Sequence, residues 1–408
     1  MTNRLAIIGG GAAGFFCAVN AARLNPGMQV LLLEKSGKLL SKVKISGGGR
    51  CNVTHACYDI VEMAKRYPRG SNFVKKAFHR FFTSDTIEWF RERGVQLKTE
   101  PDGRMFPVTD SSDTIIQCLL QEAARYQVEV RLHAEIVSLQ KTNGLFVLQT
   151  AKGERIEADQ VVVACGGYPK AAMFDWIQQT GHTIEPPAPS LFTFNLPGES
   201  LCQLMGISVS HVKISIPGTK FTEEGPLLIT HWGISGPAVL KLSAKAARWL
   251  AEHNYNCAIQ VNWLPAFHEQ SLQHSLQQWR TDAAGNKMEA RSVFGLPQRL
   301  WLYFLEQAGV KPGIRWADLP AKELNKLARL LCNQTFVMKG KTTFKEEFVT
   351  AGGISTAEVD PQTMMSRKVA GLYFAGEVLD VDGVTGGFNF QHAWTSGWVA
   401  AGAIAARE

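Results

Sequence analysis

Short apolar runs that flank a helical pattern open the chain. Leu5–Ile8 is a continuous apolar run, Phe15–Leu24 has the pattern of a buried helix, and Val30–Leu33 is a second apolar run, which ends at Glu34. Apolar runs of about four to eight residues on either side of a helix are typical of buried parallel strands. The beginning of the chain therefore predicts a βαβ unit.

The first turn of this unit predicts a dinucleotide site. It has the G-x-G-x-x-G pattern, in the sequence Gly9-Gly10-Gly11-Ala12-Ala13-Gly14. Gly9 permits the tight turn, Gly11 lets the backbone approach a pyrophosphate, and Gly14 lets helix and strand pack closely. The helix N-terminus offers N–H groups to the phosphates, and Glu34 is placed to bind an adenosine ribose. FAD and NAD both remain open on this motif alone. The predicted contacts here are Gly9, Gly11, Ala12, Ala13, Gly14, Glu34 and Lys35.

A second glycine-rich motif favours a flavin. Its sequence is Lys44-Ile45-Ser46-Gly47-Gly48-Gly49-Arg50-Cys51-Asn52-Val53-Thr54. A flexible linker is the alternative, but linkers are Gly/Ser-rich over longer spans, and apolar residues bound this one. We expect backbone close to a flat ligand, with Arg50 and Asn52 as hydrogen-bond donors, which suits an isoalloxazine ring. The predicted contacts here are Lys44, Gly47, Gly48, Gly49, Arg50, Cys51 and Asn52.

The middle of this half predicts two helices and a further parallel strand. The helices are expected over Asp85–Gly94 and Thr114–Tyr126, and a meander of four short strands over 129–158. Gln160–Ala164 has the pattern of a buried parallel strand that ends in a glycine turn. We expect it beside the first strand, with its glycines at the cofactor edge. The predicted contacts here are Ile136, Val137, Ala164, Cys165 and Gly166.

The last seventy residues return to the same pattern. Phe348–Ile354 and Gly371–Phe374 are predicted strands, and a helix with small residues follows a Gly-Gly pair. Glu377, which follows the second strand, can accept hydrogen bonds from ribityl hydroxyls. The N–H groups at the start of the helix can donate to the flavin O2 and N1 region. A plain packed C-terminal helix is the alternative. The predicted contacts here are Gly376, Glu377, Gly386, Gly387, Phe388 and Asn389.

The pattern of apolar and polar residues changes between these N-terminal and C-terminal regions, after the proline-rich stretch 186–189. Short strand-like runs follow, and then amphipathic helices rich in Gln, Leu and Trp. We predict an α/β fold with a discontinuous FAD-binding domain over 1–190 and 340–408. A β-rich, barrel-like subdomain over 191–265 and a helical segment over 266–339 are inserted into it.

Composition narrows the class of protein. The 408 residues are 45% apolar, and 43 basic against 36 acidic residues leave a net charge of +7 that we take to be spread along the chain. Eight cysteines show neither a CxxC pair nor metal-ligand spacing, so we expect no metal site. No signal peptide or membrane-length apolar run is expected, which favours a cytoplasmic protein. Dispersed charge makes nucleic acid an unlikely partner, and any RNA binding should be weak and lost by physiological salt.

The chain resembles the BaiN-like flavoproteins, also called the aminoacetone-oxidase family of FAD-binding enzymes. The matching segments are IIGGGAAG (7–14), LLEK (32–35), ISGGGRCNVT (45–54), GRMFPV (103–108), ITHWGISGPAVL (229–240), VTAGGIS (349–355) and GLYFAGEVLDVDGVTGGFNFQHAWTSGWVAAG (371–402). The resemblance implies a Rossmann-type FAD domain with an inserted β-barrel-like part and a helical segment. It also implies either reduction of conjugated steroid double bonds or weak oxidation of aminoacetone.

The expected activity is that of an FAD-dependent oxidoreductase on a small organic substrate. The sequence has no second G-x-G-x-x-G motif to hold a nicotinamide cofactor. NAD(P)H would therefore have to dock transiently over the flavin, or electrons would come from the substrate. Arg50, Cys51 and His231 are the catalytic candidates, and each has a structural alternative. His392 is expected to cap or pack. An amine oxidase and an RNA-modifying flavoprotein remain as alternatives, and the sequence leaves the proton donor, the choice of NADH or NADPH and the oligomeric state open.

Overall fold

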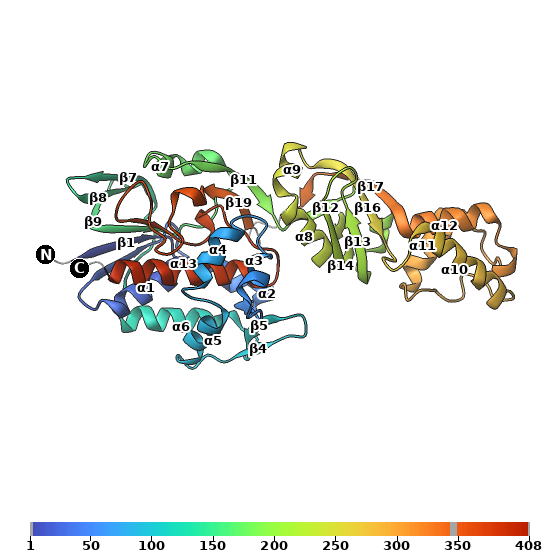
Figure 1. The fold of residues 1–408 in the computed structure, drawn as a ribbon, viewed down its shortest axis with the longest axis horizontal. Helices are drawn as coiled ribbons and strands as arrows, with labels where there is room; N and C mark the ends of the chain where they lie inside the picture. The colour runs from blue at the N-terminus through green and yellow to red at the C-terminus, as the bar shows by residue number, and fades with distance from the viewer. Residues whose placement is uncertain (1–2, 343–348, 407–408) are drawn as a thin grey trace. The chain divides into compact units, whose positions relative to one another are not determined.

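The computed structural model describes residues 3–342 and 349–406 (Figure 1). The chain divides into two compact units, one formed by 1–190 with 344–408 and the other by 191–343. They are called unit 1 and unit 2 below.

A five-stranded parallel sheet forms the centre of unit 1. Its order is β20-β10-β1-β2-β6, and every neighbouring pair is parallel. The strands are β1 (Arg4–Ile8), β2 (Gln29–Leu33), β6 (Glu129–Arg131), β10 (Gln160–Val163) and β20 (Leu372–Phe374). The predicted position of β10 beside β1 is confirmed. Strands from both ends of the chain therefore share one sheet, as a discontinuous Rossmann-type domain requires.

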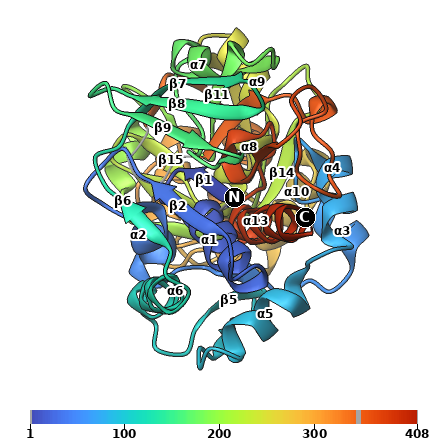
Figure 2. The ribbon, with the colours of Figure 1, turned by 90° about the vertical axis from the view of Figure 1, so that its left-hand side faces the viewer.

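Two helices cover one face of this sheet. Figure 2 shows α1 (Ala12–Leu24) and α13 (Phe388–Ala405) side by side, and they are in extensive contact. The approach is close because Gly397 has no side chain: a Cβ there would lie 2.7 Å from the carbonyl oxygen of Ala13. A small antiparallel sheet of β7 (Ile136–Thr142), β8 (Leu145–Thr150) and β9 (Arg155–Ala158) covers the other face (Figure 2).

The predicted four-strand meander is partly wrong. Its last three strands form the β7-β8-β9 sheet, but its first, β6, pairs in parallel with β2. The reason is that Glu34 N donates to Arg131 O at 2.9 Å and Ala134 N donates to Glu34 O at 2.9 Å, which continues the main sheet. Residues 129–134 therefore run beside the predicted ribose-binding acid.

Short helices and a three-stranded sheet complete the N-terminal part of unit 1. The helices are α2 (Ser41–Gly49), α3 (Ile60–Ala64), α4 (Ser71–Phe78), α5 (Thr83–Arg91) and α6 (Ser112–Arg125). The strands are β3 (Thr54–His55), β4 (Leu97–Thr99) and β5 (Arg104–Pro107). The helices predicted near residues 85–94 and 114–126 are confirmed as α5 and α6. Helix α2 was not predicted, because its sequence ends in three glycines.

The proline-rich stretch after α7 (Asp175–Gln178) is a strand. Strand β11 (Ile184–Ser190) pairs antiparallel with β19 (Val349–Ile354), with an irregular register between Glu185 and Ala188. Prolines are tolerated in a two-stranded sheet because one edge of each strand needs no ladder partner. The strand predicted from Phe348 is confirmed from Val349 onward, and Phe348 itself lies outside the described residues.

A curved seven-stranded sheet forms the β part of unit 2. Its order is β17-β16-β13-β14-β15-β12-β18. The strands are β12 (Thr193–Asn195), β13 (Ser208–Ser215), β14 (Thr222–Thr230), β15 (Gly233–Ser235), β16 (Asn256–Asn262), β17 (Gln334–Lys339) and β18 (Lys341–Thr342). The first and last strands of this order are consecutive in the chain, so the sheet curls round on itself. The barrel-like fold is confirmed.

The helices of unit 2 share one hydrophobic core with this sheet. They are α8 (Pro237–Lys245), α9 (Ala247–Glu252), α10 (Glu269–Asp282), α11 (Gln298–Ala308) and α12 (Ala321–Asn333). Trp263 of the β part and Trp301 of the helical part are both buried in the common core. Two differences from the expectation stand out: α8 and α9 interrupt the β-rich stretch, and 334–339 returns to the sheet as β17. In the described part of the chain, no helix is long and apolar enough to cross a membrane.

Candidate active site

The predicted cofactor segments follow the strands of the parallel sheet. Gly9 comes directly after β1, Glu34 after β2, Ala164 after β10, and Gly376 two residues after β20. The carboxyl ends of parallel strands meet at one edge of a sheet, where α/β proteins bind their ligands. Segments far apart in the sequence thus lie together at this edge.

In the glycine turn after β1, Gly9 and Gly14 are packed against other backbone atoms, whereas Gly11 is not. A Cβ at Gly9, which has φ +117°, would lie 2.3 Å from Ala164 O, and one at Gly14 would lie 1.9 Å from Gly9 O. Both glycines are therefore required by packing. No atom lies within 4 Å of a Cβ at Gly11, so the backbone there faces open space. That space suits the approach of a pyrophosphate.

The N-terminus of α1 is left free for an anion. Its N-cap is Gly11, no side chain caps it, and no acidic residue stands in its first turn, which includes Ala12 and Ala13. Unpaired N–H groups and the helix dipole together favour a phosphate at such an end.

Glu34 is held in place by backbone groups. Its Oε2 accepts from Gly10 N at 2.8 Å, and its Oε1 accepts from Ser36 N at 2.9 Å and Ser36 Oγ at 2.8 Å. Oε2 accepts only one of these bonds and keeps a further lone pair, which leaves an acceptor for a ribose hydroxyl. Ser36 was not predicted; its signal is its position two residues after the acid.

The second glycine motif forms an irregular end to α2. Gly47, Gly48 and Gly49 all have positive φ, and a Cβ at Gly48 or Gly49 would meet no atom within 4 Å. Gly166, after β10, has φ +78° and equally open surroundings. These three glycines present bare backbone to open space, as a flat ligand requires. A Cβ at Gly47 would instead lie 2.8 Å from the Phe106 ring.

Arg50 is fixed by acids and an aromatic ring. Its guanidinium lies 2.6 Å from Glu100 and 3.5 Å from Asp110, and 4.0 Å above the Phe106 ring. The Glu100 hydrogen bond raises the pKa of Arg50. The side chain is one-third exposed and charged, but two carboxylates already share its charge. Its role toward a flavin or substrate stays a prediction.

Cys51 and Asn52 are buried, and their surroundings argue against the roles expected of them. Burial raises the pKa of the Cys51 thiol to about 12, so the thiol is neutral at pH 7 and a poor nucleophile. With its amide oriented to match its neighbours, Asn52 donates to Thr54 O at 3.0 Å and accepts from Gly387 N at 3.0 Å. Asn52 therefore joins this motif to the start of α13, and its side chain is not a free donor.

The remaining predicted contacts of the first half differ in exposure. Lys44 Nζ pairs with Asp113 at 2.5 Å, and Lys35 Nζ lies 5.3 Å from the Tyr168 ring centre. Ile136 is buried, whereas Val137 is 46% exposed. Burial raises the pKa of the Cys165 thiol to about 11, so this thiol is neutral. These residues border the edge without a contact that assigns them a chemical role.

Glu377 joins three segments at the same edge. Its Oε1 accepts from Thr350 N at 2.8 Å, and its Oε2 pairs with Lys42 of α2 at 2.5 Å. Gly376 packs against α1, since a Cβ there would lie 2.8 Å from Ala13 Cβ. Lys42 was missed because its partner is 335 residues away in the sequence.

The N-terminus of α13 is also free of a capping side chain. Gly387, with φ +91°, is its N-cap, and no acidic residue stands in its first turn. A Cβ at Gly387 would lie 2.5 Å from Thr54 O, so only glycine fits. Phe388 stacks on His55 at 4.7 Å between ring centres, and Asn389 accepts from Gly383 N at 2.8 Å. The two uncapped helix ends, of α1 and α13, agree with the two cofactor halves expected from the sequence, and their contacts with FAD stay a prediction.

The loop before α13 is anchored by a buried ion pair. Asp382 is fully buried, pairs with Arg69 through both carboxylate oxygens, and accepts from Ser190 Oγ at 2.8 Å. Burial raises the pKa of the Asp382 carboxyl, although Arg69 acts against that shift. Neither residue was predicted, because a buried pair across 313 residues leaves no local pattern.

His392 is a buried, neutral histidine in α13. Burial lowers its pKa to about 4. Its Nε2 lies 3.3 Å from Gly376 O, and its buried Nδ1 has no hydrogen-bond partner in the described chain. Packing was the expected role, and the unpartnered nitrogen is the one feature that goes beyond packing.

His231 belongs to unit 2 and is exposed there. Its ring meets Trp232 edge to face at 4.3 Å, and Trp232 Nε1 donates to Thr193 Oγ1 at 3.1 Å. The catalytic role expected for His231 stays a prediction.

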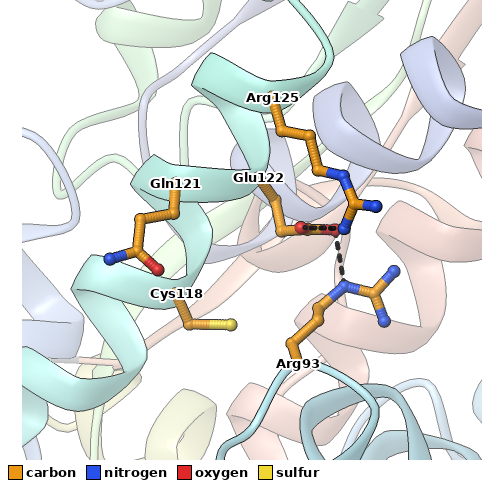
Figure 3. A pocket seen from close by; sticks show the side chains of 5 residues that line it. All are labelled: Arg93, Cys118, Gln121, Glu122 and Arg125. Carbon is orange, nitrogen blue, oxygen red and sulfur yellow. Dashed lines mark hydrogen bonds and ion pairs between the residues drawn. The ribbon is translucent and has the colours of Figure 1, made fainter.

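A surface hollow of about 420 Å³ lies elsewhere on unit 1 (Figure 3). Arg93 and Arg125 both turn toward Glu122, with Arg93 Nε 2.7 Å from the carboxylate. Cys118 and Gln121 complete its lining. It contains no predicted site residue. Within the described ranges, no group of three His, Cys, Asp or Glu side chains is arranged to hold a metal.

The fold and the sheet edge define a Rossmann-type FAD-binding protein. An open backbone at Gly11, two uncapped helix ends and bare glycines around one edge fit a dinucleotide with a flat ring. The chain belongs to the family described as HI0933-like protein Rossmann domain, whose model matches residues 3–403. It is an FAD-dependent oxidoreductase, and the resemblance to the BaiN-like flavoproteins is confirmed.

Two kinds of curated relative match nearly the whole chain. The ribosomal RNA dihydrouridine synthase of Escherichia coli is 33% identical over 97% of this chain and 96% of its own. The 3-dehydro-bile acid delta(4,6)-reductase of Clostridium scindens is 29% identical over 99% of this chain and 100% of its own.

Solved structures show the same fold at low identity. The open conformation of a flavocytochrome c3 fumarate reductase gives a TM-score of 0.52 at 17% identity, over 99% of this chain and 78% of that one. A 3-ketosteroid-delta4-(5alpha)-dehydrogenase from Rhodococcus jostii RHA1 gives 0.51 at 12% identity, over 98% and 97%.

Proposed function

We propose that the protein reduces a carbon–carbon double bond conjugated to a carbonyl, with NAD(P)H as a transiently bound reductant. The observation that carries the proposal is the convergence of Gly11, Glu34, the glycines of α2 and the start of α13 at one sheet edge. The names of the relatives support the substrate class. A bile acid delta(4,6)-reductase saturates an enone, and dihydrouridine forms when the double bond beside a uracil carbonyl is saturated.

The proposed reaction needs both the bound cofactor and groups of the protein. Bound FAD would supply a hydride to the β-carbon, after receiving one from NAD(P)H, which leaves as NAD(P)⁺. The electron pair of the double bond moves toward the carbonyl, and the α-carbon takes a proton from a protein group or water. The chain must therefore hold the ring system, polarise one oxygen and deliver one proton.

The described residues support the first of these tasks, which is to hold the ring system. The bare backbone at Gly48, Gly49 and Gly166 leaves room for a flat ring, and the N-terminus of α13 offers N–H groups that no side chain caps. Arg50 and His231 remain the candidates for polarisation and proton delivery. The neutral thiol of Cys51 makes it the weakest of the three predicted catalytic residues.

An anaerobic titration tests the proposal. The purified yellow protein is mixed with NADH or NADPH, bleaching is followed at the flavin band, and re-oxidation is then tested with a 3-keto-4-ene steroid and with uridine-containing ribosomal RNA. We expect bleaching by a nicotinamide and re-oxidation by at least one of these conjugated carbonyls. Bleaching by aminoacetone but by neither nicotinamide would instead identify the amine oxidase.

His231→Ala separates two roles for that histidine. If His231 serves the substrate, turnover falls by about 10²–10⁴ while FAD content and melting temperature stay unchanged. An unchanged turnover with a lower melting temperature would assign it a structural role. Trp232→Phe is the matched control, since it changes the neighbouring ring and leaves the imidazole in place.

A further inference from the structure

One segment of unit 1 carries a cluster of positive charge. Residues 65–80, called the basic segment below, contain six Lys or Arg residues and no Asp or Glu, in a chain whose total net charge is +7. The segment includes α4 and the turn after α3, two helices that contact each other (Figure 2). The expectation of dispersed charge is therefore wrong for this part of the surface.

Four of these cations are exposed and unpaired. Arg66, Lys75, Lys76 and Arg80 are exposed, and no carboxylate of the described chain lies within 4 Å of any of them. Lys65 of the same segment pairs with Glu62. Unpaired cations on one surface attract a polyanion and release its counterions on binding.

Several other exposed cations of unit 1 are held by acids. Arg91 lies 2.6 Å from Glu88, and Arg155 lies 2.7 Å from Glu157. Such pairs cancel the field that the cation would otherwise project. The basic segment therefore differs from these surfaces in its net charge as well as in its number of cations.

The backbone of the basic segment is tied to the loop that precedes α13. Arg66 O accepts from Val384 N at 2.9 Å, and Tyr67 Oη donates to Phe388 O at 2.6 Å. A Cβ at Gly70 would lie 2.5 Å from a methyl of Val381, so these segments touch. The N-terminal part of the basic segment, which includes Arg66, thus borders the loop of the proposed flavin site, and the other unpaired cations follow on α4 and directly after it.

We propose that the basic segment docks the phosphate backbone of an RNA substrate beside the flavin. The inference rests on the proposed function and names its substrate class: a uracil in RNA, whose ring is the conjugated carbonyl. Phosphate contacts fix the position of a nucleic acid while the base is read elsewhere. RNA is favoured over a membrane because the basic segment contacts, through Arg66, Tyr67 and Gly70, the loop of a site suited to a planar ring.

The test compares two variants with equal loss of charge. Lys75→Gln/Lys76→Gln/Arg80→Gln removes three cations of the basic segment, and Lys152→Gln/Lys170→Gln/Lys322→Gln removes three exposed lysines elsewhere. Binding of a fluorescein-labelled single-stranded RNA of mixed sequence is measured by anisotropy between about 50 and 200 mM salt. Glutamine is used because acids near the end of α4 would oppose its dipole.

The expected result is a loss confined to the first variant. Its affinity should fall at least about tenfold at low salt, and the slope of log K against log salt should decrease by about two to three. Reduction of the steroid enone with NAD(P)H should be equal in both variants. If that reduction fails in the wild type while RNA binding depends on the basic segment, the proposed function fails and the docking surface stands.

Three outcomes would overturn the docking surface. The wild type could fail to bind RNA at low salt, the two variants could bind it equally, or vesicles of phosphatidylglycerol could depend on the three cations while RNA does not. The last outcome would assign the surface to membranes. Melting temperatures of both variants show whether either substitution has damaged the fold.

Discussion

At the scale of single residues, Gly11 allows a test of the cofactor site with little disturbance of the fold. Its backbone is extended, with φ −92° and ψ −169°, and a Cβ would meet no protein atom within 4 Å. Gly11→Val should therefore fold normally and lose FAD, because its branched side chain occupies the path of the pyrophosphate. We expect FAD affinity to fall at least about 100-fold, or on the order of 3 kcal/mol.

Flavin absorbance and melting temperature, measured together, check this prediction. Gly14→Val is the matched control, because a Cβ there would lie 1.9 Å from Gly9 O and must disturb the protein itself. That variant should lose both FAD and stability. Full flavin occupancy in Gly11→Val would show that the open space at this glycine is not the pyrophosphate site.

His392 gives a prediction about pH at the same scale. The pKa of this buried histidine is lowered from 6.5 to about 4, so between these values the unfolded chain takes up a proton that the folded chain does not. The free energy of unfolding should therefore fall as pH drops from about 6.5 to 4, by at most about 3 kcal/mol from this residue.

Urea unfolding of the wild type and His392→Gln between pH 4 and 7 measures this contribution. Glutamine keeps a donor for the Gly376 carbonyl but does not titrate, so the variant should lose part of the acid sensitivity. His79→Gln, at an exposed histidine, is the control. Equal pH dependence in the wild type and His392→Gln would contradict the prediction.

Sequence could predict the residues whose roles are local. Gly14 and Glu34 follow from one turn, because Gly14 packs on Gly9 O and Glu34 accepts from Gly10 N. Asn52 and Lys42 were misjudged or missed because their partners, Gly387 and Glu377, lie more than 300 residues away. Only the folded chain brings such pairs together.

At the scale of elements, apolar runs marked the parallel strands because both faces of that sheet are buried. The same reasoning could not predict β11, whose prolines are acceptable only in a two-stranded sheet, or α2, which ends in glycines. Strand β17 was assigned to a helical region because its alternation is brief and helices precede it. Pairing with β16 determines its conformation.

Two glycines of α13 make a matched pair of predictions about helix packing. Gly397→Ala places a Cβ 2.7 Å from Ala13 O and 3.2 Å from Cys17 N, so α1 and α13 must separate. We expect a loss of about 1–3 kcal/mol in stability and weaker FAD binding. Gly402→Ala meets no atom within 4 Å, so its higher helix propensity should stabilise the protein by about 0.5–1 kcal/mol.

Denaturant midpoints of the two alanine variants decide the matter. The predicted signs are opposite, although the chemical change is the same in both. A stabilised Gly397→Ala would mean that the two helices do not depend on close approach at this glycine. A different contact would then have to hold the N-termini of α1 and α13 together.

At the scale of the whole molecule, each unit has its own core. In each unit, the strands at which the chain passes to the other unit also pair with each other. In unit 1, Ser190 of β11 is the register partner of Val349 of β19. In unit 2, Thr193 of β12 is the partner of Thr342 of β18. Each time the chain passes from one unit to the other, it therefore leaves one antiparallel strand pair and enters the other pair. This arrangement is what an inserted domain requires, and it allows the insert to be removed without cutting either core.

The last prediction is that unit 1 binds FAD without unit 2. Residues 191–348 are replaced by Asn-Gly, which favours the two-residue turn that would close β11 and β19 into a hairpin. The shortened protein should be yellow and should be bleached by NAD(P)H, because all of the proposed cofactor contacts lie in unit 1. It should lose turnover of the steroid enone if His231 and its surroundings complete the substrate site. A folded but colourless protein, shown by circular dichroism, would place part of the FAD site in unit 2. Unchanged enone turnover would instead place the entire catalytic site in unit 1 and remove His231 from the candidates.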